Sequence, residues 1–229
     1  MLLPLPPLSA DAVASRGTFR RAAASRSKRA FDVAAATVLL VVTAPLTASI
    51  VILIRATSRG PIIYRQERIG LGGTPFTLYK FRTMQAGAPV EVHEQFVAAM
   101  ISTSAIAESP GIYKLQGDPR ITRIGKWLRR MSLDELPQLV NVIRGQMSLI
   151  GPRPPLAYEV ARYAPWQHER LTVRPGITGL WQVSGRNRLT YAQMCAVDIE
   201  YIRGWSFRRD LSIALRTPWA MFVDRGGAE

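Results

Sequence analysis

The longest apolar run of the chain, residues 33–54, limits its possible folds more than any other feature. The run contains no charged residue, and at about 1.5 Å per residue a helix over it would reach about 33 Å, enough to cross a bilayer. Runs this long and uniform are rare among the buried helices of small soluble domains. The sequence therefore predicts a helical membrane segment, which we assign to residues 28–58.

Basic residues flank the apolar run on both sides. They are Arg26, Lys28 and Arg29 before the run, and Arg55 and Arg59 after it. Cationic flanks favour the cytoplasmic side of a membrane, so a helix with both ends basic has no preferred orientation as a span. The pattern instead favours a re-entrant hairpin whose two flanks stay on one side. Pro45, which lies inside the run, would supply the bend.

The charge of the whole chain predicts an anionic partner. The net charge is +14 and the pI is near 10.9, which suits nucleic acid, acidic lipid headgroups or nucleotide substrates. The only cysteine, Cys195, cannot form an internal disulfide bond and is interpreted as a small core residue.

Residues 1–27 are interpreted as a mobile basic tail, because Leu-Pro repeats are followed by an Ala/Ser/Arg stretch without the order of a signal peptide. Two roles stay open for this tail: a solvated segment, or one that rests on anionic lipid. The lipid-facing residues would be Arg16, Arg20, Arg21, Arg26, Lys28 and Arg29.

Residues 59–229 have the mixed composition of one globular domain. Short β-like runs at 62–64 and 76–79 flank the glycine-rich turn 70–73 and predict a β-hairpin. A phosphate-binding loop at that turn is less well supported, because no strand–loop–helix pattern surrounds it. Helices are expected near 90–101, 126–131, 139–143, 159–163 and 191–201. The predicted fold class is α+β and dominated by helices, with a membrane hairpin and a compact domain.

Two adjacent carboxylates, Asp134 and Glu135, lie in an apolar and cationic stretch of the chain. One interpretation is helix capping, either a capping box from Ser132 to Glu135 or Asp134 as the N-cap, which places Pro137 in the first turn. The other is a metal ion that holds an anionic substrate such as a phosphate ester or anhydride. Spacing alone favours the capping interpretation.

Several longer motifs change that balance. They are residues 60–70 (Gly-Pro to Gln-Glu-Arg-Ile-Gly), 79–84 (Tyr-Lys-Phe-Arg-Thr-Met), 118–122 (Asp-Pro-Arg-Ile-Thr), 132–139 (Ser-Leu-Asp-Glu-Leu-Pro-Gln-Leu), 147–154 (Met-Ser-Leu-Ile-Gly-Pro-Arg-Pro) and 174–187 (Arg-Pro-Gly-Ile-Thr-Gly to Gln-Val-Ser-Gly-Arg-Asn). In this order, over about residues 28–217, the chain resembles the bacterial sugar transferases, the monotopic polyprenol-phosphate phosphoglycosyl transferases of the small catalytic-domain type.

The resemblance implies a reaction. Members of this family transfer a sugar 1-phosphate from a UDP-sugar to polyprenol (undecaprenyl) phosphate and release UMP. The resemblance makes Asp134 the nucleophile of a covalent aspartyl-phosphosugar intermediate and Glu135 a ligand of Mg²⁺, with Mn²⁺ as an alternative. It places the enzyme on the cytoplasmic face of the bacterial inner membrane, at the first membrane step of exopolysaccharide or glycoconjugate synthesis.

The resemblance also implies a set of substrate-binding residues. Arg129 and Arg153 match family positions close to the phosphates, and Lys80 and Arg82 are further candidates, although surface solvation is the alternative for each cation. Asp198 matches an acidic family position and could instead be a structural ion-pair partner.

The chain departs from the family pattern at three positions. Ala44 replaces the serine of the Ser-Pro pair at the bend, where Thr43 or Thr47 would supply the missing hydroxyl. Gln146 and Arg188 replace commonly acidic or small residues and bear on the choice of sugar nucleotide.

Alternative functions stay open from the sequence. Residues 181–185 favour a hexose donor by resemblance, and an N-acetylated amino sugar is the alternative. A basic, membrane-tethered nucleic-acid-binding protein is less favoured, because the sequence shows no recognisable fold of that class. A catalytically dead assembly subunit is disfavoured by the intact Asp134–Glu135 pair.

Overall fold

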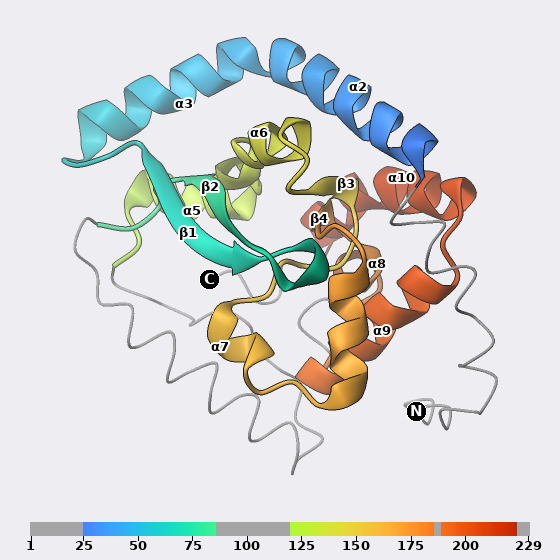
Figure 1. Cartoon of the computed structure of the whole chain (residues 1–229). Helices are drawn as coiled ribbons and strands as arrows, with labels where there is room; N and C mark the ends of the chain where they lie inside the picture. The colour runs from blue at the N-terminus through green and yellow to red at the C-terminus, as the bar shows by residue number, and fades with distance from the viewer. Residues whose placement is uncertain (1–24, 86–119, 186–188, 224–229) are drawn as a thin grey trace.

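The computed structural model describes residues 25–85, 120–185 and 189–223, and within them helices predominate over two small sheets (Figure 1). This confirms the helix-dominated α+β class. The elements are α2 (Arg26–Val42), α3 (Ala44–Thr57), β1 (Ile63–Ile69), η2 (Leu71–Gly73), β2 (Pro75–Phe81), α5 (Arg123–Arg130), η3 (Leu133–Glu135), α6 (Gln138–Ile143), β3 (Ser148–Ile150), α7 (Ala157–Val160), η4 (Pro165–Thr172), β4 (Gly176–Thr178), α8 (Leu180–Val183), α9 (Tyr191–Arg203) and α10 (Phe207–Val223). The helix expected near 90–101 lies outside the described residues, as do residues 1–24 of the tail and Arg188.

The apolar run folds into two helices, α2 and α3, which meet at a 60° bend. The break falls at Thr43, and Pro45 follows in the first turn of α3, where its missing N–H costs little. Thr43 Oγ1 donates to the carbonyl of Leu39 (2.7 Å). Of the two candidates Thr43 and Thr47, Thr43 therefore places a hydroxyl at the bend, but on a carbonyl that already accepts from its own amide (2.9 Å).

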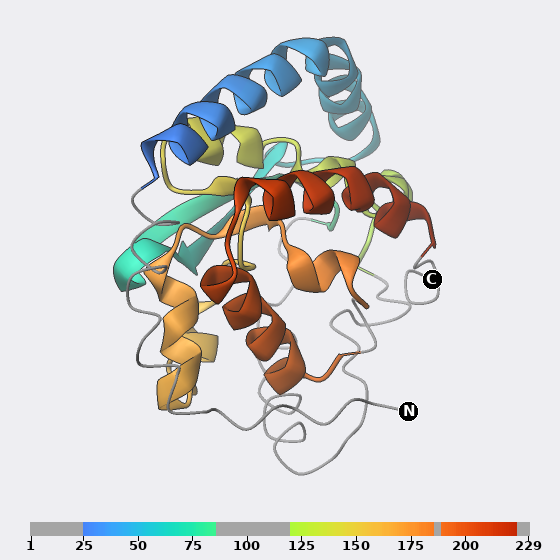
Figure 2. The same cartoon turned by 90° about the vertical axis from the view of Figure 1, so that its right-hand side faces the viewer.

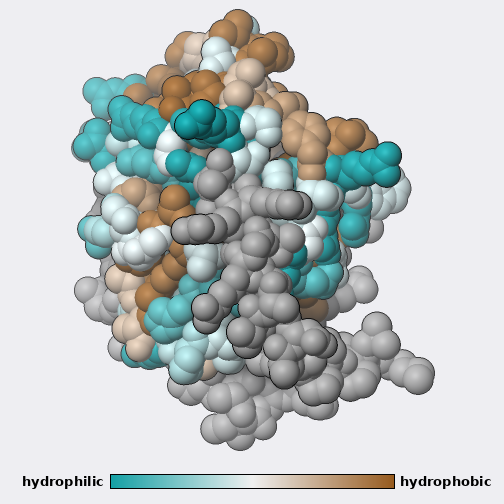
Figure 3. All heavy atoms as spheres, turned by 45° about the vertical axis from the view of Figure 1, so that its right-hand side comes forward, coloured by the Kyte–Doolittle hydropathy of each residue, from teal (hydrophilic) through white to brown (hydrophobic). Residues whose placement is uncertain are grey.

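The outer surface of the α2–α3 pair is apolar. Val41 and Val42, which lie directly before the bend, are 70% and 69% exposed, and apolar residues gather at the top of the molecule, where the pair lies (Figure 3). Among the described helices, none alone has the length and apolar character to cross a bilayer, but α2 and α3 together meet that test as a bent pair. This geometry is compatible with a re-entrant hairpin.

The inner surface of the same pair belongs to the core of the domain. Ala36 packs in one cluster with Phe76 and Val142, and Ile54 of α3 packs in another with Phe81. Both views show α2 lying along α6 (Figures 1 and 2). The segments on either side of the predicted boundary at residue 58 therefore pack together in two core clusters.

The first turns of α2 are bound to protein, which corrects the expectation that Lys28 and Arg29 rest on lipid. Lys28 is 8% exposed and its Nζ lies 2.6 Å from Asp210 Oδ2 on α10. Arg29 donates from its two terminal nitrogens to the carbonyls of Val142 (2.6 Å) and Ile143 (2.9 Å). Its positive charge lies at the C-terminal carbonyls of α6, where cations are favoured; the carbonyl of Val142 also accepts from the amide of Gly145 (3.0 Å).

The predicted β-hairpin is confirmed. β1 and β2 pair in antiparallel register from Ile63 opposite Phe81 to Ile69 opposite Pro75, with η2 as the turn. Lys80 pairs with Tyr64, and Arg68 lies four residues further along β1. Side chains alternate between faces along a strand, so Lys80 and Arg68 share the inner face of the hairpin, separated by roughly 13 Å.

The second sheet is a parallel pair, β3 with β4, against which α9 and α10 pack; in Figure 2, α10 crosses in front and α9 lies lower. The backbones approach so closely that a Cβ on Gly176 would lie 2.1 Å from the amide nitrogen of Gly151. Glycine is required there because any side chain would collide with backbone. The tight pairing fixes the start of the segment that follows β3.

Neither capping interpretation of the acidic stretch is correct. α6 begins at Gln138 after Pro137, which carries no side-chain cap, and Ser132 makes no side-chain capping bond.

The remaining expected helices are present as α5, α6, a short α7 and α9. α9 starts with a capping box between Thr190 and Gln193.

Candidate active site

Asp134 and Glu135 lie in η3, a 3-10 helix of one turn that joins α5 to α6. Ser132, directly before the turn, has φ of 53°, and it is the one described non-glycine residue with positive φ. Such a conformation costs about 1–2 kcal/mol for an L-residue, and strain of this kind collects at functional sites. With about three residues per turn, the two carboxylates point in different directions: Asp134 is buried, whereas Glu135 is half-buried.

Lys80 of β2 joins the two carboxylates. Its Nζ lies 2.7 Å from Glu135 Oε1 and 3.9 Å from Asp134 Oδ2. The hairpin and the turn are thus connected by an ion-pair cluster that is partly shielded from water, where charge interactions are stronger than at the surface. The structure places three predicted site residues in direct contact.

Arg82 and Arg129 are held by different residues near the end of β2. Arg129 Nε donates to Thr83 Oγ1 (2.9 Å), and Arg82 Nη2 donates to the carbonyl (2.9 Å) and Oγ (2.7 Å) of Ser58. Arg82 is 7% exposed, and within the described residues its Nε and Nη1 have no hydrogen-bond partner. Buried donors without hydrogen-bond partners are costly and rare. When they belong to a guanidinium group, a nearby anion would stabilise them.

Arg153 and Asp198 belong to a second cluster, centred on Arg170 of η4. Arg170 Nη2 lies 2.8 Å from Asp198 Oδ2, and both side chains are 1% exposed. The same Nη2 donates to the backbone carbonyl of Arg153 (3.3 Å). The ion-pair alternative for Asp198 therefore describes its place in the structure, and its burial leaves no surface for a substrate.

Burial and charge act in opposite directions on this second cluster: Cys195, Tyr163 and Asp198 raise the pKa of Arg170 above its usual value although Arg170 is buried. Burial is the stronger effect at Asp198. It raises the pKa of Asp198 from 3.8 to about 6, against the opposing positive charges of Arg170 and Arg153. Burial also lowers the pKa of Arg68 from 12.5 to about 10, and the positive charge of Arg153 acts in the same direction. The guanidinium of Arg153 is therefore within electrostatic reach of both Asp198 and Arg68.

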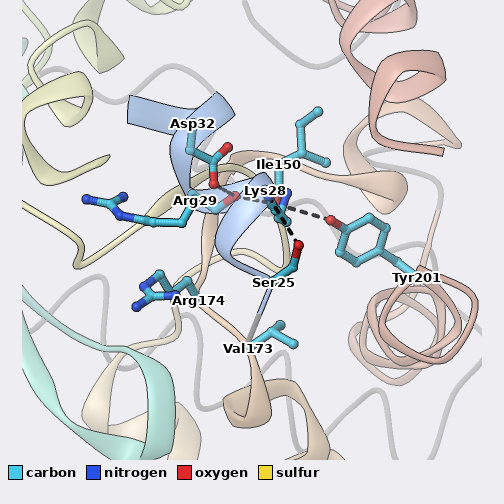
Figure 4. Close-up of a pocket in the computed structure, with 9 residues that line it drawn as sticks. Ser25, Lys28, Arg29, Asp32, Ile150, Val173, Arg174 and Tyr201 are labelled. Carbon is cyan, nitrogen blue, oxygen red and sulfur yellow. Dashed lines mark hydrogen bonds between the residues drawn. The ribbon is translucent and has the colours of Figure 1, made fainter. Parts of the chain in front are cut away.

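A small pocket lies where α2 meets the domain (Figure 4). Its lining residues are Ser25, Lys28, Arg29, Asp32, Ser148, Ile150, Val173, Arg174 and Tyr201. The charged groups at its wall already bind protein: Lys28 pairs with Asp210, and Asp32 accepts from Ser148 Oγ (2.7 Å) and the amide of Leu149 (3.2 Å). The pocket therefore lies at the junction between α2 and the rest of the domain and not at the Asp134–Glu135 turn.

The described residues contain no group of three or more His, Cys, Asp and Glu side chains that could hold a metal ion. Asp134 and Glu135 are adjacent oxygen donors, and Mg²⁺ is commonly held by one or two carboxylates together with waters and substrate phosphates. The pair fits such a partial ligand set. Closed sites of the zinc type, with four protein ligands, are not formed by the described residues.

Sequence reasoning missed Arg68, Arg170 and the Lys28–Asp210 ion pair. One signal was available: residues 152, 154 and 155 are prolines without N–H groups, so a buried segment there must accept hydrogen bonds from other parts of the chain. The sequence does not identify the donors, because they come from segments distant along the chain.

Comparison with known proteins defines the class of this protein. A family model described as Bacterial sugar transferase matches residues 23–224. The exopolysaccharide production protein ExoY of Rhizobium meliloti is 44% identical over 200 residues, which cover 87% of each chain. The UDP-glucose:undecaprenyl-phosphate glucose-1-phosphate transferase of Caulobacter vibrioides is 41% identical over 210 residues, covering 88% of this chain and 72% of that protein.

A third relative, the undecaprenyl-phosphate galactose phosphotransferase of Salmonella typhimurium, is 41% identical over 191 residues, or 83% of this chain and 39% of its own length. The protein is thus an enzyme of the sugar-transferring class. It belongs to the bacterial sugar transferase family, as the motifs of its sequence predicted.

Proposed function

We propose that this enzyme transfers a sugar 1-phosphate from a UDP-sugar to undecaprenyl phosphate at the cytoplasmic face of the bacterial inner membrane. The observation that carries the proposal is the cluster of Asp134, Glu135 and Lys80, held at the strained turn after Ser132. The names of the relatives from Caulobacter vibrioides and Salmonella typhimurium support undecaprenyl phosphate as the acceptor. The apolar outer surface of the α2–α3 pair supports a membrane location.

Asp134 is the proposed nucleophile. One of its carboxylate oxygens attacks the phosphorus that carries the sugar, so an Asp134 O–P bond forms while the P–O bond to UMP breaks and UMP leaves. An oxygen of undecaprenyl phosphate then attacks the same phosphorus, which releases the carboxylate of Asp134. No proton has to leave the nucleophile, because a carboxylate is already ionised.

An anionic nucleophile approaches an anionic diphosphate only where positive charge offsets the repulsion. Lys80 Nζ, 3.9 Å from Asp134 Oδ2, supplies one such charge. Arg82, whose side chain is about as buried as that of Arg68, would supply a second charge through the field of its guanidinium and not by direct contact; its Nε and Nη1 make no hydrogen bond to any described residue. Arg129, which Thr83 orients, and Arg153 complete the proposed phosphate-binding set.

Glu135 would hold Mg²⁺, or alternatively Mn²⁺, with Asp134 beside it. When bound, the ion would offset negative charge on the diphosphate. Glu135 presents a half-buried carboxylate, of which Oε1 binds Lys80. Lys80 thereby holds the Glu135 side chain at the edge of the cluster.

The proposed donor carries a hexose, glucose or galactose, in line with the names of the two relatives; an N-acetylated amino sugar is the alternative. Trp181 is 7% exposed and packs in a core cluster with Tyr163 and Tyr191. Its contribution to donor choice would therefore be indirect, through the shape of that core.

The test is the mass of the intact protein after incubation with a UDP-hexose in the absence of acceptor. We expect an increase by one hexose phosphate, with stoichiometric release of UMP, and no increase for Asp134→Asn. Full turnover by Asp134→Asn would refute the assignment. A panel of UDP-sugars offered with undecaprenyl phosphate then identifies the donor, and efficient use of an N-acetylated sugar alone would contradict the hexose proposal.

A further inference from the structure

The segment between β3 and α7 has irregular backbone and is nevertheless buried. Residues 151–156 are all buried except Arg153, which is half-buried. Irregular segments usually lie at the surface, because their backbone groups would otherwise lack partners. Prolines at 152, 154 and 155 remove three amide donors. The carbonyl groups of this segment therefore need hydrogen-bond donors from other parts of the chain.

Four consecutive carbonyls of this segment each accept a hydrogen bond from a distant residue. The amide of Gly176 donates to Pro152 (2.8 Å), and the amide of Ile69 donates to Pro155 (2.9 Å). The two carbonyls between them accept from side chains: Arg170 Nη2 donates to Arg153 (3.3 Å), and Arg68 Nη1 donates to Pro154 (2.9 Å). Backbone fixes the ends of the segment, and two guanidinium groups fix its middle.

Arg68 is itself firmly held on the inner face of the hairpin. Its Nε and Nη2 both donate to Gln66 Oε1, at 3.1 and 2.7 Å, which leaves Nη1 aimed at Pro154. The side chain is 6% exposed. The planar fork of arginine is pre-organised for such simultaneous bonds, whereas lysine offers one flexible point charge.

Arg170 is held from three directions. Asp198 binds its Nε and Nη2, at 3.0 and 2.8 Å, and Nη1 donates to the hydroxyl of Tyr163. Arg170 is 3% exposed. Neither Arg68 nor Arg170 therefore has room to bind a substrate directly. Arg170 donates to the carbonyl of Arg153 itself, and Arg68 donates to that of the next residue, Pro154.

We propose that Arg68 and Arg170 are positioning residues that clamp the carbonyls of Arg153 and Pro154 and so set the direction in which the Arg153 side chain meets the donor diphosphate. This inference rests on the proposed function, because Arg153 is there a phosphate-binding residue. The clamp explains why two buried arginines end on one proline-rich segment. Charge-assisted bonds to carbonyls are stronger than neutral ones, which suits a segment that must not move.

The clamp has a kinetic consequence. A displacement of a binding group by about 1 Å can cost about 100-fold in rate, so Arg68→Lys, which keeps the charge but loses the fork, should lower kcat/KM for the donor by roughly 10- to 100-fold. Arg65→Lys is the matched control, because Arg65 lies on the same strand and is exposed. It should leave kcat/KM within about two-fold of wild type.

A double-mutant cycle with Arg153→Ala separates positioning from general damage to the fold. UMP release is measured with the full-length enzyme in detergent, under single-turnover conditions for the slow variants. If Arg68 acts through Arg153, Arg68→Lys should cost 10- to 100-fold in wild type but less than about three-fold in the Arg153→Ala background. Equal losses in both backgrounds would overturn the clamp, as would normal kcat/KM in Arg68→Lys.

Gln66→Leu provides a second route if Arg68→Lys fails to fold. It removes the acceptor that orients Arg68 while leaving the arginine present, and its loss should likewise disappear in the Arg153→Ala background. A loss that persists there would overturn the clamp. Normal activity of Arg153→Ala itself would instead refute the role that the proposed function gives to Arg153, so the two failures are distinguishable.

Discussion

Lys28 and Asp210 form a buried ion pair, with Nζ 2.6 Å from Oδ2, between residues that lie 182 positions apart in the sequence. Asp210 Oδ1 also accepts from the hydroxyl of Tyr201 (2.7 Å), and Oδ2 from Trp205 Nε1 (3.1 Å). The first turn of α2 is thereby fixed to α9 and α10. This attachment is one of the contacts that fix α2 to the domain, beside its packing on α6 and β3.

Lys28→Met should therefore destabilise the protein strongly. Removal of one partner from a buried ion pair costs about 3–5 kcal/mol, since the remaining charge is left uncompensated. The measurement is the free energy of unfolding in denaturant, with the protein in detergent.

Glu169→Gln is the control for that experiment, because the Arg203–Glu169 pair, at 2.7 Å, is more exposed than the Lys28–Asp210 pair. Pairs that retain solvent contact contribute about 1 kcal/mol or less. A loss in Lys28→Met no greater than that of Glu169→Gln would show that the anchor is not important for stability.

Activity should require Mg²⁺ or Mn²⁺ and should vanish with a chelator. Glu135→Gln should raise the metal concentration needed for half-maximal UMP release by about ten-fold or more, or abolish release, because a carboxylate is replaced by a weaker neutral donor. Glu67→Gln is the control, since Glu67 is an exposed carboxylate on β1. Undiminished turnover in excess chelator would contradict the metal assignment.

The stability of the protein should carry a pH dependence from Asp198. Its pKa rises from 3.8 to about 6 on burial, so between these values the folded chain keeps a proton that the unfolded chain has lost. The folded state then binds more protons, and the free energy of unfolding falls as pH rises through this window.

Asp198→Asn removes that proton-linked contribution. The difference in unfolding free energy, wild type minus variant, should decrease from about pH 4 to about pH 6 and stay constant above about pH 7. Denaturant titrations at each pH measure it, with Glu169→Gln again as control. A difference that does not change with pH would show that Asp198 keeps an ordinary pKa in the folded protein.

Both flanks of the α2–α3 pair should lie on the cytoplasmic side of the membrane. A full span would export one basic flank, against the charge bias of membrane insertion, and the 60° bend suits a segment that enters and returns. Single cysteines at the exposed positions Ser27 and Thr57, in a Cys195→Ser background, report on the two flanks separately.

With a thiol reagent that cannot cross the inner membrane, neither Ser27→Cys nor Thr57→Cys should react in intact cells, and both should react after lysis. Labelling of only one of them in intact cells would establish a span and reject the hairpin. Pro45→Leu removes the helix-breaking ring and should make Ser27→Cys partly reactive.

Much of this protein is determined by its sequence over short distances. The apolar run, the hairpin around the glycine-rich turn and helices α5, α6 and α9 follow from periodicity and turn residues, which act between near neighbours. The motif around Asp134 and Glu135 likewise identified the family. Local patterns were sufficient for these features because the interactions that form them are local.

Tertiary structure decided the features that join distant segments. The positive φ of Ser132, the burial of Lys28 against Asp210 and the clamp of Arg68 and Arg170 on the residue 152–155 carbonyls have no local pattern that predicts them. A cation looks the same in the sequence whether it faces lipid, substrate or a buried carbonyl. Its role depends on which partner the packed core brings within a few ångströms, because desolvation makes a charge in the interior depend on that partner.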